Sequence, residues 1–114
     1  MNNVIYRPWG SYECIEQKKG YKVKKIIVNS MKRLSLQKHL HRSEHWVVVI
    51  GEALVTKGSE TFILKENQST YIPLGVTHRL ENQTDKPLEL IEVQTGELLD
   101  EAGTIRIEDD FDRE

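Results

Sequence analysis

The sequence contains little that would tie the chain to an oxidising compartment, a membrane or a nucleic acid. Its single cysteine, Cys14, excludes an internal disulfide and suits a reducing cytoplasm. No apolar run reaches membrane-spanning length, and the first residues carry no signal-type apolar segment. The net charge of -2 offers no footprint for nucleic acid. We therefore expect a cytoplasmic protein with no nucleic-acid and no membrane partner.

Amphipathic helical windows are equally absent, because apolar residues do not recur at helical spacing. Short alternating or β-branched segments occur instead, and turn residues rich in Gly, Pro, Asn and Asp separate them. The predicted strands cover residues 11–16, 21–29, 46–50, 53–57, 60–64, 69–72, 76–80, 88–94 and 104–107. This spacing predicts an all-β fold, an antiparallel sandwich or barrel. The length of 114 residues suits one domain, residues 1–114.

Residues 34–51 hold the side chains around which the rest of the chain is organised. Gln37, His39 and His41 lie two residues apart, so on a β-strand all three point to one face. Glu44 follows, and residues 46–50 have the composition of a buried strand. Burying several polar side chains in an apolar fold is costly unless something binds them. We interpret this row as the holder of a divalent metal.

A second polar cluster surrounds His78, in the pattern Pro73-x-Gly75-x-x-His78-x-x-x-Asn82. Pro-x-Gly makes a tight turn, and His78 and Asn82 then share one face of a strand. A single histidine there would more often be a hydrogen-bonded structural residue than a ligand. The presence of two such clusters favours a ligand role for His78.

The two clusters resemble the two motifs of the cupin superfamily, small β-barrels of the double-sheet jelly-roll type. Glu44 and Gly51 fit the spacing of the first motif, and counting back from Glu44 puts His39 and Gln37 at its two histidine positions. The second motif is matched around His78. The resemblance implies a single-domain cupin whose metal ligands are Gln37, His39, Glu44 and His78.

The sequence from Arg7 to about Arg113, beyond the two motifs, resembles the C-terminal isomerase domain of the bifunctional type II mannose-6-phosphate isomerase/mannose-1-phosphate guanylyltransferases. The segments that carry this resemblance include Arg7-Pro8-Trp9-Gly10, Leu34-Ser35-Leu36-Gln37, His41-Arg42-x-Glu44-His45-Trp46, Asn67-Gln68-Ser69-Thr70-Tyr71-Ile72-Pro73 and His78-Arg79-Leu80-Glu81-Asn82. The Gly-rich nucleotide loop of the transferase half is missing from the sequence. The resemblance therefore implies a mannose-6-phosphate isomerase that lacks the nucleotidyltransferase domain, as either a stand-alone isomerase or an excised domain.

The donor set itself indicates an open, catalytic metal site. One amide oxygen, two imidazoles and one carboxylate suit Zn²⁺, with Mn²⁺, Fe²⁺ or Co²⁺ as competitors, and they leave positions open for water or substrate. The absence of thiolates argues against a closed structural zinc site. An open metal can assist aldose–ketose isomerisation through an enediolate, which also needs a base that moves a proton between C1 and C2. The expected substrates are mannose 6-phosphate and fructose 6-phosphate.

The sequence leaves the base and the phosphate-binding group open between several side chains. His41 lies on the ligand face outside the four-ligand set, so it is either a catalytic group or part of the site wall. Arg42 suits a phosphate or an enediolate oxygen, and Lys24, which faces inward by parity, suits phosphate or proton transfer. Ser35 shares the ligand face and is either a phosphate donor or a structural hydroxyl.

Other polar residues are predicted to lie outside the site. His45 and Arg79 fall on the opposite parity and are expected to be outer-face or interface residues. Arg106 either closes over the mouth of the site from the tail or, as the plainer expectation, is a solvated tail charge. The predicted core consists of Ile26, Val28, Trp46, Val48, Ile50, Leu80, Ile91 and Val93.

Two other function classes remain as alternatives. A cupin dioxygenase would more often present three histidines to iron, which Gln37 weakens, and a non-catalytic sugar-binding or assembly cupin would keep the fold without turnover. The expected partner is a small-molecule sugar phosphate. We also expect a homodimer, because small cupins commonly pair through their N-terminal strands and Tyr6, Trp9 and Tyr12 offer apolar area there.

Overall fold

A computed structural model of the chain describes residues 3–97 and 103–110. The described residues form strands and turns with no α-helix, so none of them belongs to a helix able to cross a membrane. The strands are β1 (Val4–Arg7), β2 (Gly10–Lys18), β3 (Tyr21–Val28), β4 (Leu36–His39), β5 (Arg42–Ile50), β6 (Ala53–Lys57), β7 (Glu60–Leu64), β8 (Ser69–Ile72), β9 (His78–Glu81), β10 (Leu88–Gly96) and β11 (Thr104–Glu108). The expectation of an all-β fold is confirmed.

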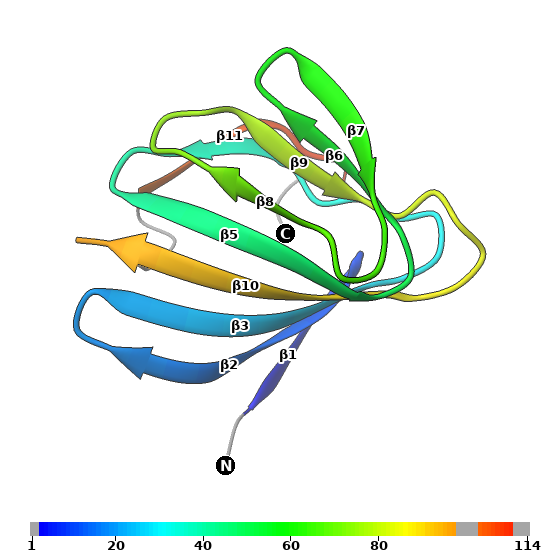
Figure 1. Cartoon of the computed structure of the whole chain (residues 1–114), viewed down its shortest axis with the longest axis horizontal. Helices are drawn as coiled ribbons and strands as arrows, with labels where there is room; N and C mark the ends of the chain where they lie inside the picture. Colours follow the sequence, from blue (N-terminus) through cyan, green and yellow to red (C-terminus); the bar gives the residue numbers. More distant parts are fainter. Residues whose placement is uncertain (1–2, 98–102, 111–114) are drawn as a thin grey trace.

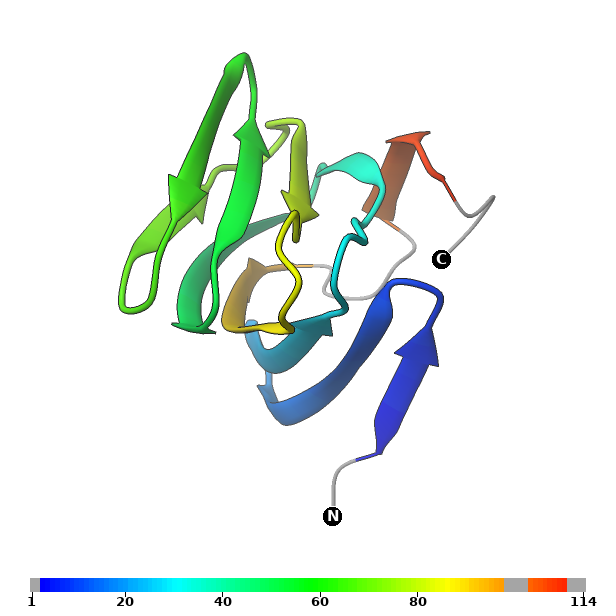
Figure 2. The same ribbon diagram turned by 90° about the vertical axis from the view of Figure 1, so that its right-hand side faces the viewer.

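Two antiparallel sheets face each other, as Figures 1 and 2 show. The larger sheet has the strand order β1-β2-β3-β10-β5-β8, and the smaller has the order β11-β4-β9-β6-β7. Some strands that are neighbours in a sheet are far apart in the sequence. In the larger sheet, for example, β10 lies between β3 and β5. Strands β6, β7 and β8 begin and end where the sequence predicted them.

The core fills the space between the two sheets. It consists of the buried side chains of Trp9, Ile26, Val28, Trp46, Val48, Ala53, Val55, Leu64, Ile72, Leu80, Leu88 and Leu90. Burying each of the larger aliphatic side chains is worth roughly 1.5–3 kcal/mol. Asn82 lies beside this core and donates its amide to the carbonyls of Val28 and Lys86, at 2.9 and 2.7 Å, which ties the β9–β10 connection to β3.

The inward face of the larger sheet changes from apolar to charged along its central strands. Across β3, β10 and β5, a row of Ile26, Leu90 and Val48 belongs to the core. The next row along the strands places Lys24 beside Glu92, which in turn lies beside Trp46. The same three strands therefore supply the core at one end and a polar wall at the other.

Three of the predicted core residues do not lie in the core. Ile91 and Val93 are only partly buried on the outer face, because β10 turns Leu90, Glu92 and the residues in phase with them inward. Alternation from Trp46 and Val48 would turn Ile50 inward, but a register shift between β5 and β10 pairs it with Glu89, and Ile50 is 51% exposed. Hydrophobicity alone therefore predicted the wrong face of β10.

The N-terminal residues form an edge strand and a turn that the sequence indicated only in part. Arg7 ends β1, Pro8 and Trp9 make the turn, and Gly10 begins β2. Trp9 is buried against the core, so it does not supply the exposed area expected for a dimer contact, whereas Tyr6 is 77% exposed. Homodimer formation stays a prediction, which light scattering can check.

Candidate metal centre and its cavity

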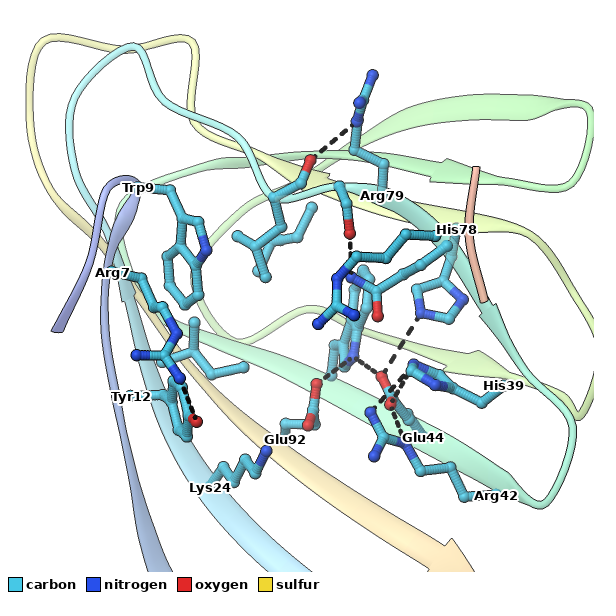
Figure 3. Close-up of a pocket in the computed structure, with 17 residues that line it drawn as sticks. Arg7, Trp9, Tyr12, Lys24, His39, Arg42, Glu44, His78, Arg79 and Glu92 are labelled. Atoms are coloured by element: carbon cyan, nitrogen blue, oxygen red, sulfur yellow. Dashed lines mark hydrogen bonds and ion pairs between the residues drawn. The ribbon is translucent and has the colours of Figure 1, made fainter. Parts of the chain in front are cut away.

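Three metal-competent side chains meet between the two sheets. His39 ends β4, Glu44 lies in β5, and His78 begins β9, and all three are buried. One ligand atom from each lies within 4.8 Å of the others. Figure 3 shows the two imidazole rings and the carboxylate converging from different strands on one point of the cavity wall. His39 and Glu44, which are close in the sequence, thus form one cluster with the distant His78.

Hydrogen bonds orient both imidazole rings toward this point. The Nδ1 atom of His78 lies 2.9 Å from the carbonyl oxygen of Val76, which can only accept, so this nitrogen carries the proton and Nε2 keeps its lone pair. The Nδ1 atom of His39 lies 2.9 Å from the hydroxyl of Thr104 in β11. Metal-binding histidines in proteins are held in the same way through the second ring nitrogen.

Gln37 completes the set that the sequence predicted. It pairs with His78 across β4 and β9, is 9% exposed and lines the cavity. Its amide nitrogen donates to the hydroxyl of Ser35 at 2.8 Å, so its carbonyl oxygen is the atom available to a ligand. Ser35 thus holds Gln37 in place, which supports the structural reading of this hydroxyl. The structure brings the four predicted ligands together, and their assignment as ligands stays a prediction.

The charge of Glu44 is stabilised inside the protein. Burial alone raises the pKa of its carboxyl, but the hydrogen bond with His39, the adjacent His78 ring and the charge of Arg42 outweigh burial and hold the pKa well below its usual range. Arg42 donates from Nε to Glu44 Oε2 at 2.9 Å and lies 3.1 Å from His39 Nε2. Burial lowers the pKa of His78, which keeps its ring neutral. A carboxylate and neutral imidazoles are the forms that bind a divalent metal, so this donor set fits one.

Glu92 is a functional candidate that the sequence reasoning missed. Trp46 donates its indole N–H both to Glu44 Oε1 at 3.0 Å and to Glu92 Oε2 at 3.1 Å, and Gln94 donates its amide to Glu92. Burial, and then the negative charge of Glu44, raise the pKa of Glu92 to about 8, against the opposing charge of Lys24. The signal was present, because Glu92 and Gln94 alternate in phase with the buried leucines of a central strand.

In the metal-free protein, Glu92 is expected to make the folded state less stable as the pH rises from about 4.5 to about 8. Its pKa is raised on folding, so its contribution to stability is fully present below the unfolded value and is lost as the pH rises through the folded value. Glu44, with a lowered pKa, acts on the acid side of this window. Urea unfolding below and above the window measures the slope, which Glu92→Gln should reduce. Glu89→Gln, on the outer face of β10, should leave the slope unchanged.

A cavity of about 320 Å³ adjoins this cluster, at the small end of the range typical of ligand sites. Lys24, Ser35 and Arg42 line it, as the sequence predicted. Its full lining is Arg7, Trp9, Tyr12, Lys24, Ile26, Leu34, Ser35, Gln37, His39, Arg42, Glu44, Trp46, His78, Arg79, Leu80, Glu92 and Arg106.

Three predictions about individual residues are wrong. His41 does not line the cavity, because β4 ends at His39 and the exposed His41 lies in the bend before β5. Arg79 is buried and lines the cavity, and it donates to the carbonyl of Leu34 at 3.0 Å, so it is not an outer-face residue. Arg106 is half-buried in the cavity wall, because β11 pairs with β4 and brings the tail beside Gln37. By contrast, His45 is exposed, as predicted.

Comparison with known proteins supports this arrangement. The family of the mannose-6-phosphate isomerase C-terminal domain matches residues 1–109. The chain is 56% identical over 109 residues to the xanthan biosynthesis protein XanB of Xanthomonas campestris pv. campestris and 50% identical over 113 residues to the mannose-1-phosphate guanylyltransferase ManC of Salmonella typhimurium. These alignments cover 96% and 99% of this chain but 23% and 24% of the relatives, so the chain spans about a quarter of their length.

Solved structures of the same shape have much lower sequence identity. The capsular polysaccharide assembling protein CapF of Staphylococcus aureus matches with a TM-score of 0.80 at 20% identity, over 95% of this chain and 34% of that one. Oxalate decarboxylase of Lactobacillus farciminis matches with a TM-score of 0.80 at 19% identity, over 93% and 33%. At such identities the likeness shows the fold.

Facing antiparallel sheets that hold a His/Glu/His cluster between them give this protein the double-stranded β-helix fold of the cupins. The chain belongs to the mannose-6-phosphate isomerase C-terminal family.

Proposed function

We propose that this domain is a metal-dependent isomerase that interconverts mannose 6-phosphate and fructose 6-phosphate. The observation that carries the proposal is the meeting of Gln37, His39, Glu44 and His78 on the wall of a cavity that several cations also line. Membership of the isomerase family supports it. The guanylyltransferase activity in the name of ManC is not proposed for this domain, which covers 24% of that relative.

In this proposal the four clustered side chains hold the metal, for which Zn²⁺ is the best match and Mn²⁺, Fe²⁺ and Co²⁺ are competitors. When bound, the metal supplies Lewis-acid polarisation of a sugar carbonyl. Arg42 holds Glu44 and His39 in place and directs positive charge at the same point, where negative charge develops on a substrate oxygen.

Proton transfer between C1 and C2 requires an acid–base group on the cavity wall. His41 is excluded from this role by its position, so we assign the transfer to Glu92. Glu92 lines the cavity, and its cross-strand neighbour in β3 is Lys24. The Trp46 indole bridges Glu92 to Glu44, which places this proton-carrying group beside the metal ligands.

The proposal is tested by turnover with and without metal. Purified protein supplied with Zn²⁺ is expected to convert mannose 6-phosphate into fructose 6-phosphate, followed by a coupled assay. A chelator should lower the rate by about 100-fold or more, because the electrostatic contribution of the metal is lost. Restored Zn²⁺, Mn²⁺ or Co²⁺ should return the activity and rank the metals. Absence of turnover in metal-replete protein, or a rate insensitive to chelation, contradicts the isomerase proposal and favours a non-catalytic sugar-binding cupin.

We also expect the protein to work in the cytoplasm, where sugar phosphates are made and consumed. The relatives named for xanthan and alginate biosynthesis support a role in supplying sugar precursors.

A further inference from the structure

We propose that Arg7, Trp9 and Lys24 form a phosphate-binding subsite on the side of the cavity away from the metal ligands. The inference deepens the proposed function, because it assigns the phosphate of the sugar to a place in the site. Figure 3 shows Arg7, Trp9 and Tyr12 on one side of the cavity and His39, Glu44 and His78 on the other. All six residues line the same cavity.

Arg7, Trp9 and Lys24 all contact the ring of Tyr12 in one corner of the cavity. The guanidinium carbon of Arg7 lies 5.5 Å from the centroid of the Tyr12 ring, and Nζ of Lys24 lies 4.6 Å from it. Arg7 also reaches the Tyr12 hydroxyl at 3.4 Å. The Trp9 ring stacks on Tyr12, with centroids 6.4 Å apart and an angle of 17° between the planes. One aromatic ring thus brings two cations and an indole together, although like charges repel each other.

The indole N–H of Trp9 gives independent evidence for a ligand. Trp9 is 3% exposed, and its Nε1 atom is buried with no hydrogen-bond partner among the described residues. A buried donor left unsatisfied costs free energy, and most such donors in native proteins have a partner. Because Trp9 lines the cavity, an acceptor bound there can satisfy this donor. Indole N–H groups only donate, so the partner must be an acceptor.

The chemistry of the corner selects a phosphate monoester. Arginine and lysine donors bind phosphate oxygens through charge-assisted hydrogen bonds, and a phosphate carries enough oxygens to satisfy three donors at once. The charged neighbour that competes for Lys24 is Glu92, its partner across β3 and β10. A neutral sugar offers no charge to this corner.

Arg42, a buried arginine beside the metal ligands, is already committed. Arg42 contacts Glu44 and His39 and lies on the metal side of the cavity. Placing the phosphate beside Arg7 and Lys24 therefore leaves the opposite end of the sugar, which carries C1 and C2, toward the metal ligands. Of the phosphate candidates that the sequence offered, Arg42, Lys24 and Ser35, this arrangement keeps Lys24 and adds Arg7.

The test measures binding to the full chain without metal, so that phosphate oxygens cannot bind to a cation in the site. Calorimetry with mannose 6-phosphate, inorganic phosphate and mannose should show binding of the first two and none of mannose. Arg7→Gln and Lys24→Gln should each weaken mannose 6-phosphate binding roughly tenfold or more, the loss expected for a charge-assisted hydrogen bond. Lys25→Gln is the matched control, because Lys25 follows Lys24 on the outer face and pairs with Glu89.

A third variant, Trp9→Phe, keeps the buried ring and removes the donor. It should weaken mannose 6-phosphate binding severalfold or more, and thermal melting shows whether the fold is intact. If Trp9→Phe fails to fold, Arg7→Gln, at a partly exposed residue, still decides the question.

The outcomes separate the subsite from the isomerase proposal. Binding that depends on Arg7 and Lys24 in a protein without isomerase activity supports the subsite and contradicts the proposed function. If the protein is an active isomerase but Arg7→Gln and Lys24→Gln both bind mannose 6-phosphate with unchanged affinity, the subsite is wrong and the proposed function is unaffected. Equal binding of mannose and mannose 6-phosphate, or no phosphate binding at millimolar concentration, also overturns the subsite.

Discussion

Replacing Glu44 with alanine is expected to remove the bound metal and the isomerase activity together. Glu44 supplies the only carboxylate of the three-residue cluster, and its two oxygens face His39 and His78. Loss of an outer partner of a metal ligand typically weakens metal binding by about 10–100-fold, so loss of a ligand should cost at least about 100-fold. Metal content after dialysis and turnover of mannose 6-phosphate are the two measurements.

The controls for this result address folding and charge. Removing Glu44 leaves Arg42 buried without its carboxylate, which typically destabilises a protein by about 3–5 kcal/mol, so Glu44→Gln is tested beside Glu44→Ala. Glu89→Gln removes a carboxylate from the outer side of β10 and should keep metal and activity. Arg42→Ala removes an outer partner of Glu44 and His39, so it should weaken metal binding by about 10–100-fold and lower turnover. Full metal content in both Glu44 variants contradicts the ligand assignment.

Gly10→Ala is expected to be the most destabilising of the small substitutions in the chain. Gly10 begins β2 with a φ of +154°, and a β-carbon there would lie 1.9 Å from the carbonyl oxygen of Ile27 in β3. The obstacle is backbone, so β2 and β3 must separate where Gly10 pairs with Val28. We expect a loss of at least about 2 kcal/mol in the free energy of unfolding.

Thermal or urea unfolding measures this loss, and the same chain offers a matched control. Gly20 lies in the β2–β3 turn with a φ of +89°, but a β-carbon there meets nothing within 4 Å. Gly20→Ala therefore carries backbone strain without the clash, and should cost about 1 kcal/mol. Equal losses at the two positions would show that the approach of β2 to β3 is unimportant. Because Trp9 precedes Gly10, the variant should also weaken phosphate binding.

The position of Arg42 shows how a sequence can predict that a residue is in the site and leave its contacts open. Arg42 was predicted to contact a phosphate or an enediolate oxygen because it lies beside the ligand row in a motif shared with the family. In the structure it lies buried against Glu44 and His39, where it stabilises the ionised carboxylate. Residues two apart in a strand point to the same face of the sheet. Arg42 therefore lies beside Glu44, which follows it by two residues in β5.

Alternation also explains which other residues were misplaced. His41 has the right parity for the site, but parity holds only within a strand, and β4 ends at His39. Glu92 and Ile91 compete for the inward face of β10, and the apolar residue is the usual choice for a core. The buried end of β10 borders a cavity instead, so the charged residue faces inward.

The sequence by itself determined the all-β fold and pointed to candidate metal ligands. Strand periodicity and turn residues are local properties, and the ligand set followed from the resemblance of residues 34–51 and 73–82 to the two cupin motifs. Only the tertiary structure decided which cations line the cavity. Arg7, Arg79 and Arg106 come from β1, β9 and β11, and their approach depends on how the two sheets pair and close. The indole N–H of Trp9 likewise lacks a hydrogen-bond partner only in the folded chain, because folding removes it from water.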